Sequence, residues 1–447
     1  MTVELPVNQI VCGDCLEVMR DWPDCCVDTI ITDPPYGLGF MGKGWDHGVP
    51  GVDSWTAFLR IAKPGAILMA FGGTRTWHRL ACAIEDAGWE IRDTIMWVYG
   101  QGWPKGQDIS KAIDKEAGAE RKRIGRKIAA DGTMVGRVDG NSKTHEGYQH
   151  PWRNKPIEEQ PTAWITAPAT DAAKLWQGWS TTLKPSWEPI IVASKSIEGT
   201  YAQNAVKWGV AGYNIDACRI PANGDRLDGG RVSTTTDGWD RPWKHDDEAL
   251  RKCRERGDSA VERAESLGRW PANLAHDGSE EVLRLFPQTT SGEIRDGVRA
   301  GKRSNHGIYG QMKAVEKFAY HENSGSAARF FYCGKASRSE RTCGGKVSNN
   351  HPTVKPVSLM RWLVRLTSTP SGGIVLDPFC GSGSTLLACA LEGRPWIGID
   401  DDPASCETAR KRMMTMRPED YEGPEIMLPI KEIESGQMVL FDKESRR

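Results

Sequence analysis

Two short stretches, Ile30–Tyr36 (IITDPPY) and Val375–Gly383 (VLDPFCGSG), decide how this sequence folds. Each is an apolar strand pattern that runs into a loop of unusual chemistry. The first loop carries a carboxylate, two backbone positions without an N–H donor and an aromatic ring. The second carries glycines, which let a ligand approach the backbone closely. Because open α/β sheets bind ligands beyond the carboxyl ends of their strands, the pair predicts an enzyme that holds a flat base and a nucleoside cofactor.

Strand and helix patterns alternate around both stretches. This alternation predicts an α/β fold with a largely parallel sheet that is covered by helices on both faces. A single apolar strand, 189–193, interrupts the irregular middle of the chain. The other predicted strands are 28–32, 66–71, 94–99, 373–377 and 395–400, and the predicted helices are 55–61, 75–87, one beginning near 108, 357–367, 384–392 and 404–414.

The middle of the chain is irregular and basic. Between residues 105 and 341, Lys and Arg outnumber Asp and Glu by 38 to 32, although the whole chain has a formal net charge of −1. Basic clusters lie at 121–127, 251–256 and 299–303, and many of the 18 tryptophans lie between them. Any one cluster could be a solvated helix face. Three of them interleaved with aromatic residues indicate a nucleic-acid backbone as the partner.

The loop chemistry separates this chain from other nucleotide-binding enzymes. The Asp33 carboxylate and the Pro34 carbonyl can both accept hydrogen bonds from one exocyclic amino group, and Tyr36 offers a face on which a base can stack. Gly381 and Gly383 resemble the glycine loops of dehydrogenases. A dehydrogenase, however, needs neither acceptors for an amino group nor an aromatic face for a base. The pattern therefore favours an amine as the group acted upon.

Several blocks together resemble the amino-methylating DNA methyltransferases of the permuted β class, in which the catalytic motif precedes the cofactor motif. The resemblance covers roughly residues 8–100, 183–220 and 325–412. Segments 102–105, 183–189 and 214–219 are similar to a phage- and prophage-associated branch. The matching blocks are Cys12-Gly13-Asp14-Cys15-Leu16, Asp33-Pro34-Pro35-Tyr36, His351-Pro352-Thr353-Val354-Lys355-Pro356, the loop Asp377–Thr385 and Gly398-Ile399-Asp400.

The resemblance implies a Rossmann-like, seven-stranded, mostly parallel sheet with an inserted target-recognition region, and S-adenosylmethionine as the cofactor. Asp400 stands where relatives more often carry the ribose-binding Glu, and Asp14 is expected to contact the cofactor adenine. The implied catalytic residues are Asp33, Pro34, Pro35 and Tyr36. The implied cofactor-binding residues are Asp14, Cys15, Thr353, Lys355, Asp377, Phe379, Cys380, Gly381, Ser382, Gly383, Ser384 and Asp400.

The expected organisation has six parts. The catalytic half comprises 1–99, followed by a basic, Trp-rich insert at 100–186 and a returning core strand at 187–197. The target-recognition region is expected at 198–328, the cofactor-binding half at 329–415 and a polar tail at 416–447. No signal peptide or membrane span is expected, so a cytoplasmic protein acting on double-stranded DNA as a monomer or homodimer is predicted. The 12 cysteines are expected to be reduced thiols rather than metal ligands.

Two questions stay open at this point. Asp before Pro-Pro-Tyr is commoner in adenine-N6 enzymes of the family and Ser in cytosine-N4 enzymes, but both bases place an amino group beside a ring nitrogen. Adenine is the favoured target and cytosine is the alternative. Methylation of RNA or of a protein amide, and a catalytically idle DNA-binding module, are the rival functions.

Overall fold

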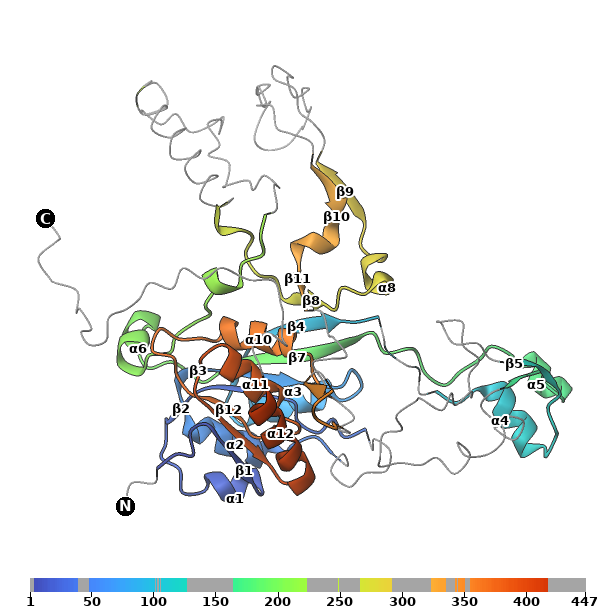
Figure 1. Cartoon of the computed structure of the whole chain (residues 1–447), viewed down its shortest axis with the longest axis horizontal. Helices are drawn as coiled ribbons and strands as arrows, with labels where there is room; N and C mark the ends of the chain where they lie inside the picture. The colour runs from blue at the N-terminus through green and yellow to red at the C-terminus, as the bar shows by residue number, and fades with distance from the viewer. Residues whose placement is uncertain are drawn as a thin grey trace, which may run out of the picture.

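The structure is a computed structural model, and it describes residues 4–38, 48–100, 102, 104, 106–126, 164–222, 248, 266–291, 323–334, 342–343, 345–349 and 354–416. Its centre is a nine-stranded sheet (Figure 1). The first part of the chain forms β1 (Gln9–Cys12), α1 (Cys15–Met19), β2 (Val27–Thr32), α2 (Val52–Ile61), β3 (Ala62–Phe71), α3 (Trp77–Asp86) and β4 (Glu90–Val98).

The middle of the chain returns to the sheet three times, at β7, β8 and β11. Its elements are α4 (Ile109–Glu116), β5 (Arg123–Arg126), β6 (Trp164–Thr166), α5 (Asp171–Leu175), β7 (Trp187–Ser194), α6 (Tyr201–Trp208), η5 (Asp216–Cys218), β8 (Leu274–His276), α8 (Glu280–Leu283), β9 (Gln288–Ser291), β10 (Asn323–Ser326), η7 (Ala327–Phe330) and β11 (Tyr332–Cys333). The last part forms α10 (Val357–Leu366), β12 (Val375–Asp377), α11 (Ser384–Leu391), β13 (Trp396–Asp400) and α12 (Pro403–Thr415).

The strand order across the sheet is β1-β13-β12-β2-β3-β7-β4-β8-β11. All pairings are parallel except those of β7, which runs antiparallel to both β3 and β4. The prediction of a mostly parallel sheet is therefore confirmed, but the expected count of seven strands is wrong. The short strands β8 and β11 come from the irregular middle and extend one edge of the sheet.

Helices cover both faces of the sheet, as the alternation predicted. On one face, side chains of α10 and α11 pack against Ile31, Met69 and Phe71. On the other, α1, α2 and α3 pack against Ile30 and Leu68. Neighbouring residues of β2 and β3 thus alternate between two apolar cores, which is why both strands are almost continuously apolar. No helix in the described ranges is both long enough and apolar enough to span a bilayer.

Two extensions leave this core (Figure 1). One, which we name the arm, is formed by α4, β5, β6 and α5, and it is held together by the buried Asp114. This carboxylate accepts hydrogen bonds from Arg121 at 2.6 Å and from the Thr170 hydroxyl at 2.8 Å. The other extension carries the antiparallel pair β9 and β10. The arm lies within the predicted 100–186 insert, and the β9–β10 pair within the predicted 198–328 region.

Candidate active site

The two loops that decide the fold leave neighbouring strands. β2 and β12 pair in parallel, with Ile30 opposite Leu376, so their carboxyl ends meet at the same edge of the sheet. From β2 the chain continues to β3 on one side, and from β12 it continues to β13 on the other. In open α/β sheets, ligands bind where the connections from two neighbouring strands lead to opposite sides in this way. The Thr32 hydroxyl donates to Asp377 Oδ1 at 2.8 Å and so ties the two loops together.

Asp33 is held by two donors, one from its own loop and one from a distant part of the chain. The Tyr36 hydroxyl donates to Asp33 Oδ1 at 2.6 Å, and Lys355 Nζ donates to Asp33 Oδ2 at 2.8 Å. The Thr76 hydroxyl donates to the Tyr36 carbonyl at 2.6 Å and fixes the end of the loop. The Asp33 side chain keeps 20% of its surface exposed, so a ligand can still reach it.

The charge of Lys355 is maintained by two carboxylates. Its ammonium lies 3.1 Å from Glu188 Oε2 as well as 2.8 Å from Asp33, although the side chain is only 7% exposed. Burial lowers the pKa of Lys355, but the ion pairs with Asp33 and Glu188 outweigh burial and raise the pKa above its usual value. Burial and the same two carboxylates raise the pKa of Tyr36, so its hydroxyl stays a donor.

The second loop, 378–383, is shaped by glycines and by Asp400 at the end of β13. Gly381 has a φ of +51° and donates its N–H to Asp400 Oδ2 at 2.7 Å. Gly383 has a φ of +80°, and a Cβ there would lie 3.0 Å from the Cβ of Ala409. Burial raises the pKa of Asp400 to about 6, against the opposing effect of the N–H donors of Gly381 and Asp402.

A buried arginine anchors the same loop from α12. Arg412 has no exposed surface, and its Nη1 donates to the Ser382 carbonyl at 2.5 Å. The same nitrogen lies 3.1 Å from the Ser382 hydroxyl and 3.3 Å from the Ser384 hydroxyl. Ser382 and Ser384 were predicted to bind the cofactor, and in the described structure their side chains contact Arg412.

The remaining predicted cofactor residues lie in different surroundings. Asp14 is exposed and caps α1 by accepting from the N–H groups of Leu16 and Glu17, and Phe379 packs edge-to-face on Phe58 with centroids 6.0 Å apart. The side chains of Cys15, Cys380 and Asp377 are buried in the fold. Lys355 lies at the catalytic loop, and Thr353 lies outside the described residues.

The exposed part of this loop region suits a nucleoside. Each Asp400 oxygen accepts one backbone N–H and keeps a further lone pair, which could accept from a ribose hydroxyl. Gly381 is partly exposed and presents no Cβ. Cys380 N donates to the Ile399 carbonyl at 2.9 Å and Gly13 N to the Asp400 carbonyl at 2.9 Å, so the loops after β1, β12 and β13 lie together.

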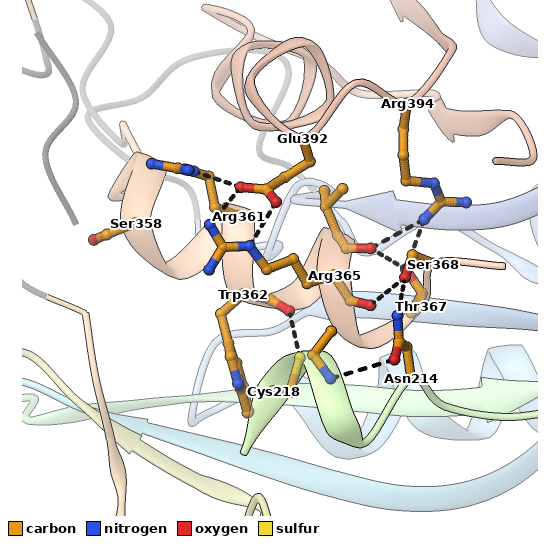
Figure 2. Close-up of polar contacts among 12 residues, drawn as sticks. Asn214, Cys218, Ser358, Arg361, Trp362, Arg365, Thr367, Ser368, Glu392 and Arg394 are labelled. Atoms are coloured by element: carbon orange, nitrogen blue, oxygen red, sulfur yellow. Dashed lines mark hydrogen bonds and ion pairs between the residues drawn. The ribbon is translucent and has the colours of Figure 1, made fainter. Parts of the chain in front are cut away.

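Helix α10 positions Lys355, which lies two residues before it, and Figure 2 shows how this helix is fixed. Arg361 and Arg365 both donate to Glu392 after α11, at 2.6 Å and 2.5 Å. Arg394 donates to the Val364 carbonyl at 3.1 Å and to the Thr29 hydroxyl of β2 at 3.3 Å. The helix is thereby tied to the strand that carries Asp33.

Asp377 makes the stability of the fold depend on pH. Its carboxylate accepts from the hydroxyls of Thr385 and Thr32, but burial dominates and raises its pKa to about 7. Between its unfolded pKa of about 4 and about 7, the folded protein keeps a proton that the unfolded chain has lost. This contribution to stability is therefore present at low pH and is lost as the pH rises through about 7.

We expect Asp377→Asn to flatten this part of the pH dependence, because an amide does not titrate. In urea unfolding at several pH values between about 4 and about 8, the wild-type free energy of unfolding should carry an extra negative slope of up to about 1.4 kcal/mol per pH unit. An identical slope in Asp377→Asn would contradict the assignment of a raised pKa to Asp377.

Sequence reasoning missed several residues of this region. Glu188 lies in a segment that was noted only for its resemblance to relatives, and Tyr99 and Arg412 were not selected at all. A carboxylate just before the apolar run 189–193 is the one local signal that could have indicated Glu188. Nothing in the sequence around Arg412 distinguishes it from the neighbouring basic residues of α12.

Comparisons with known proteins show the family of this chain. The family model described as DNA methylase matches residues 27–411. The chain is 48% identical over 62 residues to the type II methyltransferase M.EcaI of Enterobacter cloacae, which is 14% of each chain. It is 31% identical over 112 residues to the type II methyltransferase M2.LlaDCHI of Lactococcus lactis subsp. cremoris, which is 25% of this chain and 38% of that relative. These matches thus span well under half of either relative.

The solved structures found are more distant. The PvuII DNA methyltransferase (cytosine-N4-specific) aligns over 92% of this chain and 89% of its own, at 12% identity and a TM-score of 0.39. The M1.HpyAVI–SAM complex aligns over 90% and 98%, at 15% identity and a TM-score of 0.35. Structural similarity at TM-scores this low says nothing about the site.

The fold is that of an α/β protein in which a carboxylate, Asp33, lies after the strand next to the one that leads to a glycine-rich loop. Because the family match spans most of the chain and includes both loops, the family is settled. The chain belongs to the DNA methylase family that comprises N6-adenine and N4-cytosine methyltransferases.

Proposed function

We propose that this protein is a site-specific DNA methyltransferase that transfers a methyl group to the exocyclic amine of a base. The observation that carries the proposal is the Asp33 carboxylate, held by Tyr36 and Lys355 directly beside the strand that leads to the glycine loop. An acceptor fixed in this way can hold an amino group and direct its lone pair. The short matches to type II methyltransferases support the same reading.

S-adenosylmethionine is the cofactor that we propose for the second loop. Gly381, Phe379, Asp400 and Asp14 are the residues that we expect to hold it. When bound, it supplies a methyl group on a positively charged sulfur, which keeps the bonding electron pair on transfer. The amine nitrogen of the base gains the methyl carbon and releases one proton, to Asp33 or to water.

The chain's own residues orient the base in this proposal. Asp33 and the Pro34 carbonyl accept from the amino group, and Tyr36 stacks on the ring once the base has been flipped out of the duplex, at a cost of a few kcal/mol. Adenine N6 is the first candidate, because Asp33 begins the catalytic tetrad, and cytosine N4 is the alternative.

We further propose that the protein belongs to the permuted class and reads DNA with its middle regions. The catalytic loop after β2 precedes the cofactor loop after β12 in the chain, as that class requires. Stacked arginine and aromatic side chains support the assignment of 198–328 to target recognition. Arg219 lies 5.3 Å from the ring of the exposed Trp270, and Arg269 lies 4.7 Å from that of Phe330, two residues beyond this range. We also propose that the protein acts in the bacterial cytoplasm, in a phage-associated role, as a monomer or homodimer.

Mass spectrometry of nucleosides tests the proposed function. Purified protein is incubated with S-adenosylmethionine and unmethylated duplex DNA, which is then digested. We expect N6-methyldeoxyadenosine, formed in proportion to enzyme and time. N4-methyldeoxycytidine would keep the mechanism and change the base. No modified nucleoside on DNA of varied sequence would contradict the proposal and favour an RNA, a protein amide or no substrate.

A further inference from the structure

A second carboxylate, Glu188 on β7, closes the catalytic site. Its Oε2 lies 3.1 Å from Lys355 Nζ and 3.4 Å from the Tyr36 hydroxyl oxygen, while its Oε1 accepts from the Tyr99 hydroxyl at 3.5 Å. β7 pairs with β4, where Glu188 lies opposite Trp97, and its side chain is 21% exposed. Glu188 therefore contacts both residues that hold Asp33.

The three N–H donors of Lys355 match the three acceptors around it. These are Asp33 Oδ2 at 2.8 Å, the Tyr36 hydroxyl oxygen at 3.0 Å and Glu188 Oε2 at 3.1 Å. Because a lysine ammonium has three hydrogens, this arrangement can use all of them. The ammonium is thus shared between two carboxylates and is not committed to Asp33 alone.

The charges of this cluster add up to a net negative site. Asp33 and Glu188 each contribute −1 and Lys355 contributes +1, while burial and the nearby carboxylates keep the hydroxyls of Tyr36 and Tyr99 protonated by raising their pKa values. If Glu188 were neutral, Lys355 would cancel the charge of Asp33. The difference matters because Lys355 is almost completely buried, where charges interact more strongly than in water.

We propose that Glu188 is a positioning residue for methyl transfer: by balancing Lys355, it leaves the Asp33 carboxylate with an uncompensated negative charge toward the amino group. This inference rests on the proposed function. As the bond to the methyl carbon forms, the amine nitrogen becomes positively charged before it loses its proton. A site with a net charge of −1 stabilises that developing charge, and a neutral site does so less.

Glu188→Gln tests the proposal, because it keeps the shape of the side chain and removes its charge. We expect kcat to fall about 10-fold to 100-fold, since the residue acts through Lys355 and not by direct contact. The KM for DNA and the Kd for S-adenosylmethionine should stay within about threefold. Glu188→Asp, which keeps the charge on a shorter side chain, should recover part of the lost kcat. A kcat in Glu188→Gln equal to that of the wild type would overturn the proposal.

A double-mutant cycle separates action through Lys355 from a general structural role. If Glu188 acts through the ammonium, Glu188→Gln should cost nothing further in a Lys355→Met background. Full additivity of the two losses would overturn the proposal. Glu407→Gln is the matched control, because it breaks an exposed ion pair with Lys411 of 3.3 Å, and it should leave kcat unchanged.

A readout without cofactor or DNA tests the ion pair itself. Only a neutral lysine reacts with acetic anhydride, and the loss of Glu188 lowers the pKa of Lys355. Mass spectrometry should therefore find Lys355 acetylated about 10-fold faster in Glu188→Gln than in the wild type, with the exposed Lys411 as internal standard. Equal rates would overturn the proposal. If the wild type methylates nothing, the proposed function fails; if it is active and Glu188→Gln is equally active, only this inference fails.

Discussion

Asp33→Ala should reduce the turnover of methyl transfer by about 10³-fold, because it removes the acceptor that orients the amino group and leaves Lys355 with one carboxylate instead of two. Binding of S-adenosylmethionine, measured by calorimetry, should stay within about threefold. The reason is that Asp33 follows β2, whereas the proposed cofactor residues lie after β1, after β12 and at the end of β13. The variant thus separates chemistry from cofactor binding.

Two comparisons sharpen this experiment. Asp33→Asn keeps the size of the side chain and should lose nearly as much turnover as Asp33→Ala, since the charge is what the amine needs. Asp24→Ala removes a carboxylate that is 70% exposed and paired with Arg60 at 2.9 Å, and it should have wild-type turnover. Unchanged turnover in Asp33→Ala would refute the role assigned to this residue and with it the proposed mechanism.

The second large effect is expected at Arg412, which holds the glycine loop from inside the protein. Arg412→Ala would leave a cavity and would remove the donor to the Ser382 carbonyl and to the hydroxyls of Ser382 and Ser384. We expect a loss of about 3 to 5 kcal/mol in the free energy of unfolding, measured in urea. The Kd for S-adenosylmethionine should rise at least about 10-fold, because the loop would no longer be fixed.

The neighbouring Lys411 provides the control for this variant. Its side chain is 60% exposed and pairs with Glu407 at 3.3 Å, so Lys411→Ala should change the free energy of unfolding by less than about 0.5 kcal/mol. Arg412→Met should fill most of the cavity that Arg412→Ala leaves, but it has no hydrogen-bond donor for the glycine loop. If Arg412→Met bound the cofactor as tightly as the wild type, the hydrogen bonds to the loop would have no part in binding.

Much of the fold could be predicted from the sequence because its central strands are short apolar runs between glycines and prolines. The expected strands at 28–32, 66–71 and 189–193 correspond to β2, β3 and β7. The strand β1 was missed because it is an edge strand of four residues with exposed ends. The short strands β8 and β11, of three and two residues, are formed by sheet pairing and leave almost no local pattern.

The candidate site could be predicted only where its chemistry is local. Asp33 and Tyr36 lie three residues apart and form a recognisable loop, and Gly381 and Gly383 indicate the second loop, 378–383. The link between Lys355 and Asp33 joins residues 322 apart, so no window of sequence contains it. The buried serines and Asp377 show the complementary difficulty, because a loop motif does not say which side chains face the ligand and which hold the loop.

The pairing of β1 with β13 has a consequence for how the chain is made. Gln9 pairs with Ile397, and the Arg410 guanidinium donates to the Ile10 carbonyl across 400 residues. During synthesis at roughly 5 to 20 residues per second, β13 would be completed roughly 20 to 80 seconds after β1, and until then β1 has no strand to pair with. An unpaired strand edge is prone to aggregation in that interval. Lys355 is likewise added 322 residues after Asp33, so a chain that terminates before residue 355 should lack the ammonium group that holds the Asp33 carboxylate.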